Sequence, residues 1–172
     1  MFGDFCDNHG KTVGSMKEVV LGIGNTLKGD DGIGIYIVER IDKKQAKFTE
    51  IGRRVAAINC GTTPENYTSI IRKHNPDRLI LIDAADMGLS PGSYRIIPPE
   101  KIEAVYVSTH SMALSLLISY VSEFCNDIVF IGVQPHKMDV GAALSSTVRR
   151  SGEHVANLVI EERLSEITTL GT

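Results

Sequence analysis

The sequence contains few cysteines and no long apolar run. Its three cysteines, Cys6, Cys60 and Cys125, are an odd number, lie far apart and include no Cys-x-x-Cys pair. This pattern excludes a disulfide framework and a structural zinc site. The longest apolar runs, such as DIVFIGVQ, are far shorter than the roughly 20 residues that a membrane-spanning helix needs. We therefore expect no membrane insertion.

A large excess of charge of one sign is also absent. The 172 residues carry a formal net charge of −3, and the 18 basic residues are scattered along the chain. A nucleic-acid partner is not expected, because a nucleic-acid-binding protein needs a basic patch on its surface. Residues 1–16 lack the basic start and the apolar core of a secretory signal. We predict that they form a flexible N-terminal extension and that the protein is cytoplasmic.

The rest of the chain, residues 17–172, alternates between strand and helix patterns. Several of the strand-like runs are nearly continuous valine, isoleucine and leucine, which is typical of parallel strands covered on both faces. The sequence therefore predicts a single α/β domain of three layers, α/β/α, around a mostly parallel sheet. We predict strands at residues 18–24, 54–59, 77–84, 92–98 and 127–135, and helices from residue 34 and at residues 65–74, 109–124 and 146–167.

Polar side chains gather where the predicted strands end, which is where α/β proteins place their sites. They are Asn25, Asp30 and Asp31 after the first strand, Asn59, Cys60 and Thr62 after the second, Asp83 and Asp86 after the third, Thr109 and His110 at the later helix, and Gln134 and His136 after the last strand. Carboxylates and imidazole bind cations. Two aspartates and a histidine from three different loops suit zinc, nickel, manganese or iron and leave coordination positions open.

A nucleotide site is a second interpretation of the first loop. Gly22 and Gly24 match the start of the dinucleotide-binding fingerprint, but Leu27 occupies the third glycine position. The second strand ends in Asn59 rather than in an acidic residue that could hold a ribose. No Gly-Lys-Ser/Thr of a P-loop follows either. A small nucleotide-binding domain is therefore the weaker alternative.

Four blocks of the sequence resemble those of one known family. GIGNTLKGDDGIG is similar to the N-terminal signature of the nickel–iron hydrogenase maturation endopeptidases, and IDAADMGLSPGSYRIIPPEKI, STHSMALSLLISY and FIGVQP resemble later blocks in the same order. The resemblance extends from about residue 17 to residue 162 and is nearest to the hydrogenase-3-type branch. It implies a twisted five-stranded sheet. It also implies an endopeptidase that removes the C-terminal extension of the hydrogenase large-subunit precursor after nickel insertion.

The same resemblance implies a set of site residues. Asp31, Asp83 and His110 match the family's metal-binding positions, and the nickel is supplied by the precursor as a recognition element. Whether the nickel also takes part in the cleavage is left open, and no catalytic residue is assigned. The sequence offers no Ser-His-Asp arrangement or His-Glu-x-x-His motif.

The second strand departs from the family pattern. Asn59 occupies a position that is usually aspartate, so it keeps an acceptor oxygen but loses the charge. This departure leaves an alternative function open, a metal-checking chaperone of the large subunit that does not cut. We expect Asn59, Cys60 and Thr62 to lie in a second shell or to contact substrate, with Cys60 a buried thiol rather than a nucleophile. Asp30 is expected to steady its own turn.

Overall fold

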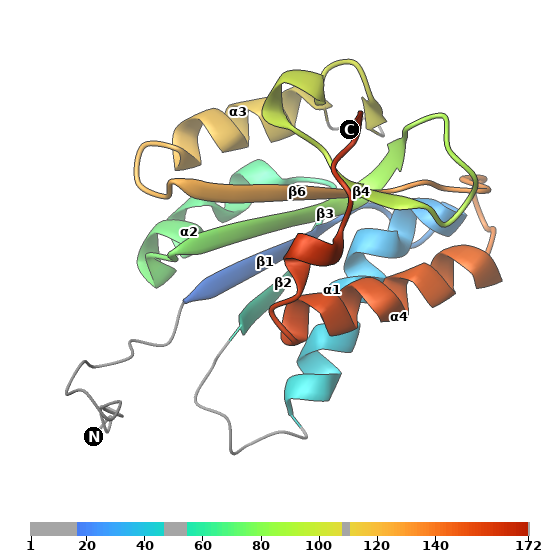
Figure 1. The fold of residues 1–172 in the computed structure, drawn as a ribbon, viewed down its shortest axis with the longest axis horizontal. Coiled ribbons are helices and arrows are strands. Elements are labelled where there is room, and N and C mark those ends of the chain that lie inside the picture. The colour runs from blue at the N-terminus through green and yellow to red at the C-terminus, as the bar shows by residue number, and fades with distance from the viewer. Residues whose placement is uncertain (1–16, 47–54, 108–110, 172) are drawn as a thin grey trace.

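A computed structural model describes residues 17–46, 55–107 and 111–171 and confirms the predicted fold class. Within these ranges, five strands form a sheet in the order β2-β1-β3-β6-β4 (Figure 1). All neighbours in it are parallel except β4, which runs antiparallel to β6. The strands are β1 (Glu18–Ile23), β2 (Val55–Gly61), β3 (Arg78–Asp86), β4 (Tyr94–Ile96) and β6 (Asp127–Val133). A two-residue strand that the sequence did not predict, β5 (Tyr106–Val107), pairs with the end of β3.

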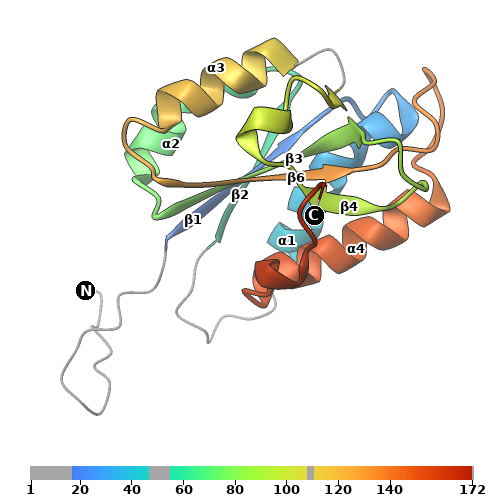
Figure 2. The ribbon, with the colours of Figure 1, turned by 45° about the horizontal axis from the view of Figure 1, so that its top comes forward.

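Helices cover both faces of the sheet, as Figure 2 shows. On one face lie α1 (Ile33–Gln45) and α4 (Ser146–Ile160), and on the other lie α2 (Thr68–His74) and α3 (Ser111–Val121). Successive strand residues point to opposite faces, so Val20 joins the α1–α4 core while Val19 and Leu21 join the α2–α3 core. Two hydrophobic cores therefore hold three layers together. Among the helices in the described ranges, none has the length and apolar character needed to cross a membrane.

The described ranges also contain four short 3-10 helices between or after these elements. They are η1 (Gly29–Gly32), η2 (Pro64–Tyr67), η3 (Pro99–Lys101) and η4 (Leu164–Glu166). Pro64 stands at the first position of η2, where its missing N–H costs no hydrogen bond. The predicted N-terminal extension, residues 1–16, lies outside the described residues, as do Thr109 and His110.

The last helix is shorter than the sequence predicted. We expected it to reach residue 167, but α4 ends at Ile160. Glu162 has a φ of 58°, and the Arg163 N–H donates to the Leu158 carbonyl at 2.8 Å, which is a left-handed helix stop. Leu164 and Ile167 are nevertheless buried in the α1–α4 core. The helical spacing of apolar residues continues beyond Ile160 because Leu164 and Ile167 still contact the core. The prediction therefore took buried residues that follow the helix for part of the helix.

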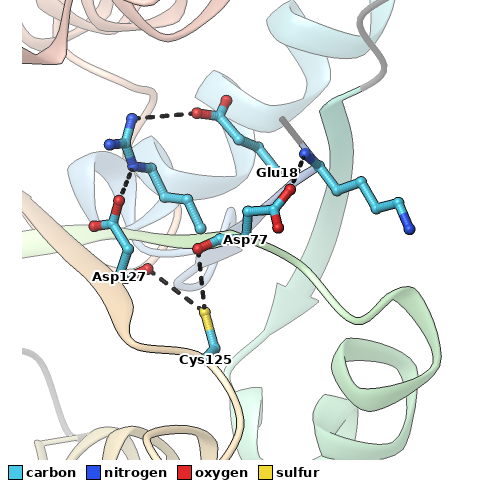
Figure 3. Close-up of polar contacts among 6 residues, drawn as sticks. Glu18, Asp77, Cys125 and Asp127 are labelled. Atoms are coloured by element: carbon cyan, nitrogen blue, oxygen red, sulfur yellow. Dashed lines mark hydrogen bonds and ion pairs between the residues drawn. The ribbon is translucent and has the colours of Figure 1, made fainter. Parts of the chain in front are cut away.

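The amino ends of the central strands are joined by charged side chains (Figure 3). Arg78 on β3 is the register partner of both Glu18 on β1 and Asp127 on β6. Its guanidinium lies 3.3 Å from Glu18 Oε1 and 2.6 Å from Asp127 Oδ2. Nearby, Asp77 accepts a hydrogen bond from the Lys17 backbone N–H at 2.8 Å. The side chains at the amino ends of the strands therefore make structural contacts, and the functional site is expected at the carboxyl ends.

Candidate functional site

The start of α1 lies directly on the sheet because two glycines meet there. A Cβ on Gly34 would lie 2.3 Å from the carbonyl oxygens of both Ile23 and Ile82, and a Cβ on Gly22 would lie 2.3 Å from the Gly34 carbonyl oxygen. No larger residue fits such a contact. The close approach places the turn before α1 over the carboxyl ends of β1 and β3, where Asp31 and Asp83 lie.

Gly24 brings the backbone even closer at the turn itself. Its φ of 138° is one that side-chain-bearing residues rarely adopt, and a Cβ there would lie 1.8 Å from the Asp31 carbonyl oxygen and 3.7 Å from Asp83 Oδ1. The Asn25 N–H donates to the same Asp31 carbonyl at 3.2 Å, and the Gly24 N–H donates to the Gly61 carbonyl at 2.8 Å. These contacts fix the ends of β1 and β2 and the backbone of Asp31 as one unit.

Asp31 and Asp83 are brought together in the interior. Asp83 is fully buried and Asp31 is 3% exposed. Asp83 Oδ1 accepts a hydrogen bond from the Ala84 N–H at 2.7 Å, but Asp83 Oδ2 and Asp31 Oδ1 are buried without a hydrogen-bond partner. Burial and, to a smaller extent, the charge of Asp31 raise the pKa of Asp83 well above its ordinary value. Two unpartnered carboxylate oxygens in one buried place call for a cation or a proton.

Asp30 is also fully buried, but it is completely hydrogen-bonded. Its Oδ2 accepts from the backbone N–H groups of His136 at 2.8 Å and Lys137 at 2.9 Å and from the Ser145 hydroxyl at 2.8 Å, and its Oδ1 accepts from the Ser145 N–H at 2.6 Å. Burial alone would raise the pKa of Asp30, but these hydrogen bonds together lower it. Asp30 steadies its turn, as expected, and it does so by fastening the turn to the β6–α4 connection, more than 100 residues away.

The residues after β2 take three different positions. Asn59 is exposed, and its Oδ1 accepts a hydrogen bond from the Gly61 N–H at 2.9 Å, so it orders the end of its own strand. Thr62 is exposed. Cys60 is 2% exposed in the α2–α3 core, and burial raises the pKa of its thiol to about 12. Such a thiol is almost entirely protonated at neutral pH, which agrees with its expected role as a buried residue.

Asp86 forms a turn at the end of β3 and has a partner that the sequence did not reveal. Its Oδ1 accepts hydrogen bonds from the Gly88 N–H at 3.2 Å and from Gln134 Nε2 at 3.0 Å. Gln134 in turn accepts from the Met87 N–H at 2.7 Å. The buried amide of Gln134 therefore holds the turn after β3 against the end of β6. His136, by contrast, has an exposed side chain.

His110, the third expected metal ligand, lies outside the described residues. Within residues 17–46, 55–107 and 111–171, no three histidine, cysteine, aspartate or glutamate side chains gather as a metal site. The structure thus describes two members of the predicted set of three, and the set stays a prediction.

A shallow hollow lies beside the carboxylate pair. It is lined by Gly24, Asn25, Thr26 and Leu27 of the β1–η1 turn, by Asn59, Gly61 and Thr62 at the end of β2, and by Ile35 and Glu39 of α1. Two of the residues expected near substrate, Asn59 and Thr62, are thus part of its wall, whereas Cys60 is not.

Comparisons with known proteins agree with this fold. The model of the family described as hydrogenase maturation protease matches residues 35–162. The Hydrogenase 3 maturation protease of Escherichia coli is 39% identical over 121 residues, 70% of this chain and 74% of that protein. The solution structure of the endopeptidase HycI from Escherichia coli has a TM-score of 0.74 at 30% identity, covering 91% of this chain and 97% of that one. The crystal structure of a [NiFe] hydrogenase maturation protease HycI from Thermococcus kodakarensis has a TM-score of 0.74 at 32% identity, with 88% and 94% covered.

These likenesses define the class of protein, a peptidase built on a three-layer α/β/α fold. The family match spans most of the chain, and the Escherichia coli relative exceeds 30% identity over more than two thirds of it. The chain belongs to the hydrogenase maturation protease family.

Proposed function

We propose that this protein is the endopeptidase that removes the C-terminal extension of a nickel–iron hydrogenase large-subunit precursor after nickel has been inserted. One observation carries the proposal: Asp31 and Asp83 each keep a buried carboxylate oxygen without a hydrogen-bond partner at the carboxyl edge of the sheet. Family membership supplies the reaction class and the kind of substrate.

The residues of the pair fit a metal ion carried by the substrate. Carboxylate oxygens, with an imidazole if His110 joins them, are a mixed oxygen and nitrogen set that suits nickel. Nickel in the precursor supplies the positive charge that the buried carboxylate pair lacks. Asp31 and Asp83 hold the loaded precursor, and the hollow beside them receives the neighbouring peptide. A precursor without nickel lacks this anchor, so cleavage follows metal insertion.

The test is cleavage of purified large-subunit precursor, with and without nickel, by this protein. We expect a shortened product only from the nickel-loaded precursor. Equal cleavage of both forms would reject nickel as the recognition element. A stable complex that yields no product would favour the alternative, a metal-checking chaperone that does not cut. The cytoplasmic location of the reaction stays a prediction from the sequence.

A further inference from the structure

The most exposed large apolar side chains in the described parts of the chain lie on two segments beside the site. Val140 is 79% exposed and Leu27 is 70% exposed. Leu27 lines the hollow next to the carboxylate pair, and the Gly141 N–H donates to the Leu27 carbonyl at 2.8 Å. The two apolar residues therefore stand on backbone segments that are hydrogen-bonded to each other.

These segments are held firmly although both are irregular. The Asp30 N–H donates to the Lys137 carbonyl at 2.9 Å, and the Asp30 carboxylate accepts the four hydrogen bonds from residues 136, 137 and 145. The neighbouring Met138 and Leu144 pack against the α1–α4 core, which anchors the β6–α4 connection on both sides of Val140. Val140 is thus exposed on a fixed segment.

We propose that Leu27 and Val140 form an apolar contact edge for the precursor polypeptide, and that Asp30 is the positioning residue that holds the edge beside the Asp31–Asp83 pair. The hollow that Leu27 borders has one charged lining residue, Glu39, and is otherwise polar and uncharged or apolar. Such a surface suits an extended peptide, whose backbone finds hydrogen-bonding groups while an apolar side chain packs on the edge. This inference rests on the proposed function.

The first test compares serine variants of exposed apolar residues in the full chain. Leu27→Ser and Val140→Ser are each expected to raise the Kd and KM for nickel-loaded precursor about tenfold with little change in kcat, because each removes apolar contact area. Leu116→Ser is the matched control: Leu116 is 65% exposed on α3, outside the hollow. Leu116→Ser is expected to leave the Kd and the KM for the precursor unchanged. Equal behaviour of all three variants would overturn the proposal.

The second test asks whether Asp30 acts through the edge. Asp30→Asn replaces a carboxylate oxygen that accepts three hydrogen bonds, or the one that accepts from the Ser145 N–H, and is expected to raise KM. Ser145→Ala removes one hydrogen bond and is expected to have a smaller effect in the same direction. In the double variant Asp30→Asn/Val140→Ser, the KM effects should be less than additive. Full additivity, or a lower kcat at unchanged KM, would show that Asp30 does not act through Val140.

The two proposals fail in different ways. If wild-type protein neither binds nor cleaves the loaded precursor, the proposed function and the contact edge are both rejected. If wild type cleaves and the variants at Leu27 and Val140 match it, only the contact edge is rejected. If Asp30→Asn does not fold, as judged by thermal unfolding, the comparison of Leu27→Ser and Val140→Ser with Leu116→Ser decides.

Discussion

Asp31 and Asp83 share one buried place at the carboxyl edge of the sheet, and each keeps a carboxylate oxygen without a hydrogen-bond partner. Burial, joined by the charge of Asp31, raises the pKa of Asp83. A site that served folding alone would give each of these carboxyl groups a hydrogen-bond partner. Burying the pair without partners lowers the stability of the fold, which is typical of binding sites, because a bound cation offsets that loss.

The first prediction concerns the stability that the buried Asp31–Asp83 pair takes from the fold. Asp83→Asn replaces one of the two buried carboxyl groups with a neutral amide and should leave Tm unchanged or higher, while abolishing processing of the nickel-loaded precursor. Thermal unfolding and the cleavage assay measure the two effects on the same preparation. A variant that lost several degrees of Tm would show that the Asp83 carboxylate stabilises the fold, contrary to the role inferred for the pair.

The second prediction concerns the complete ligand set. Asp31→Ala, Asp83→Ala and His110→Ala should each abolish processing and retain the fold by circular dichroism, because removal of any ligand weakens the hold on the precursor's nickel. A matched control is His136→Ala, which changes an exposed histidine near the same edge. Full cleavage by any of the three ligand variants would remove that residue from the set.

The third prediction concerns Asn59. Its side-chain oxygen accepts from the Gly61 N–H, and an aspartate oxygen can accept the same hydrogen bond. Asn59→Asp should therefore keep cleavage within about a factor of ten of wild type, a margin that corresponds to about 1.4 kcal/mol. An inactive variant with unchanged Tm would indicate that the neutral amide is needed at the wall of the hollow.

The fourth prediction concerns Cys60. With its pKa raised to about 12, about one thiol in ten thousand is ionised at pH 8, since the thiol gains its charge only as pH approaches the pKa. Iodoacetamide at pH 8 should therefore label Cys60 slowly in the folded protein and rapidly after denaturation. Cys60→Ala should retain cleavage. Rapid labelling of folded protein, coupled to loss of activity, would restore the cysteine as a candidate nucleophile.

The fifth prediction concerns the opposite edge of the sheet. Arg78→Ala should lower the free energy of unfolding by about 1–3 kcal/mol, because Arg78 contacts the buried Glu18 as well as the partly exposed Asp127. Arg163→Ala is the control, since its partners Glu161 and Glu166 are half exposed, and should lower the free energy of unfolding clearly less than Arg78→Ala does. Urea unfolding measures both. A similar loss of unfolding free energy in the two variants would show that the burial of Glu18 does not strengthen its ion pair with Arg78.

The sequence by itself determined the three-layer architecture and showed that the site lies at the carboxyl ends of the strands. The near-continuous apolar runs of β1, β3 and β6 indicated parallel strands buried on both faces, and in such sheets polar side chains at strand ends meet at one edge. The order of elements along the chain was therefore enough to bring the loops that carry Asp31 and Asp83 to one end of the sheet, and the family resemblance singled out these two residues. The end of α4 could not be predicted, because Leu164 and Ile167 keep the apolar spacing of a helix after the helix has stopped.

Only the tertiary structure showed what physically separates the two adjacent aspartates. The family resemblance assigned Asp31, and not Asp30, to the metal, but as side chains at one turn the two are chemically the same. In the fold, Asp30 receives four hydrogen bonds from the β6–α4 connection, whereas Asp31 keeps an unpartnered oxygen in the same buried place as Asp83. No local pattern encodes this difference, because the donors come from residues 106 to 115 positions away. Long-range packing decided which carboxylate fastens the structure and which is left for a ligand.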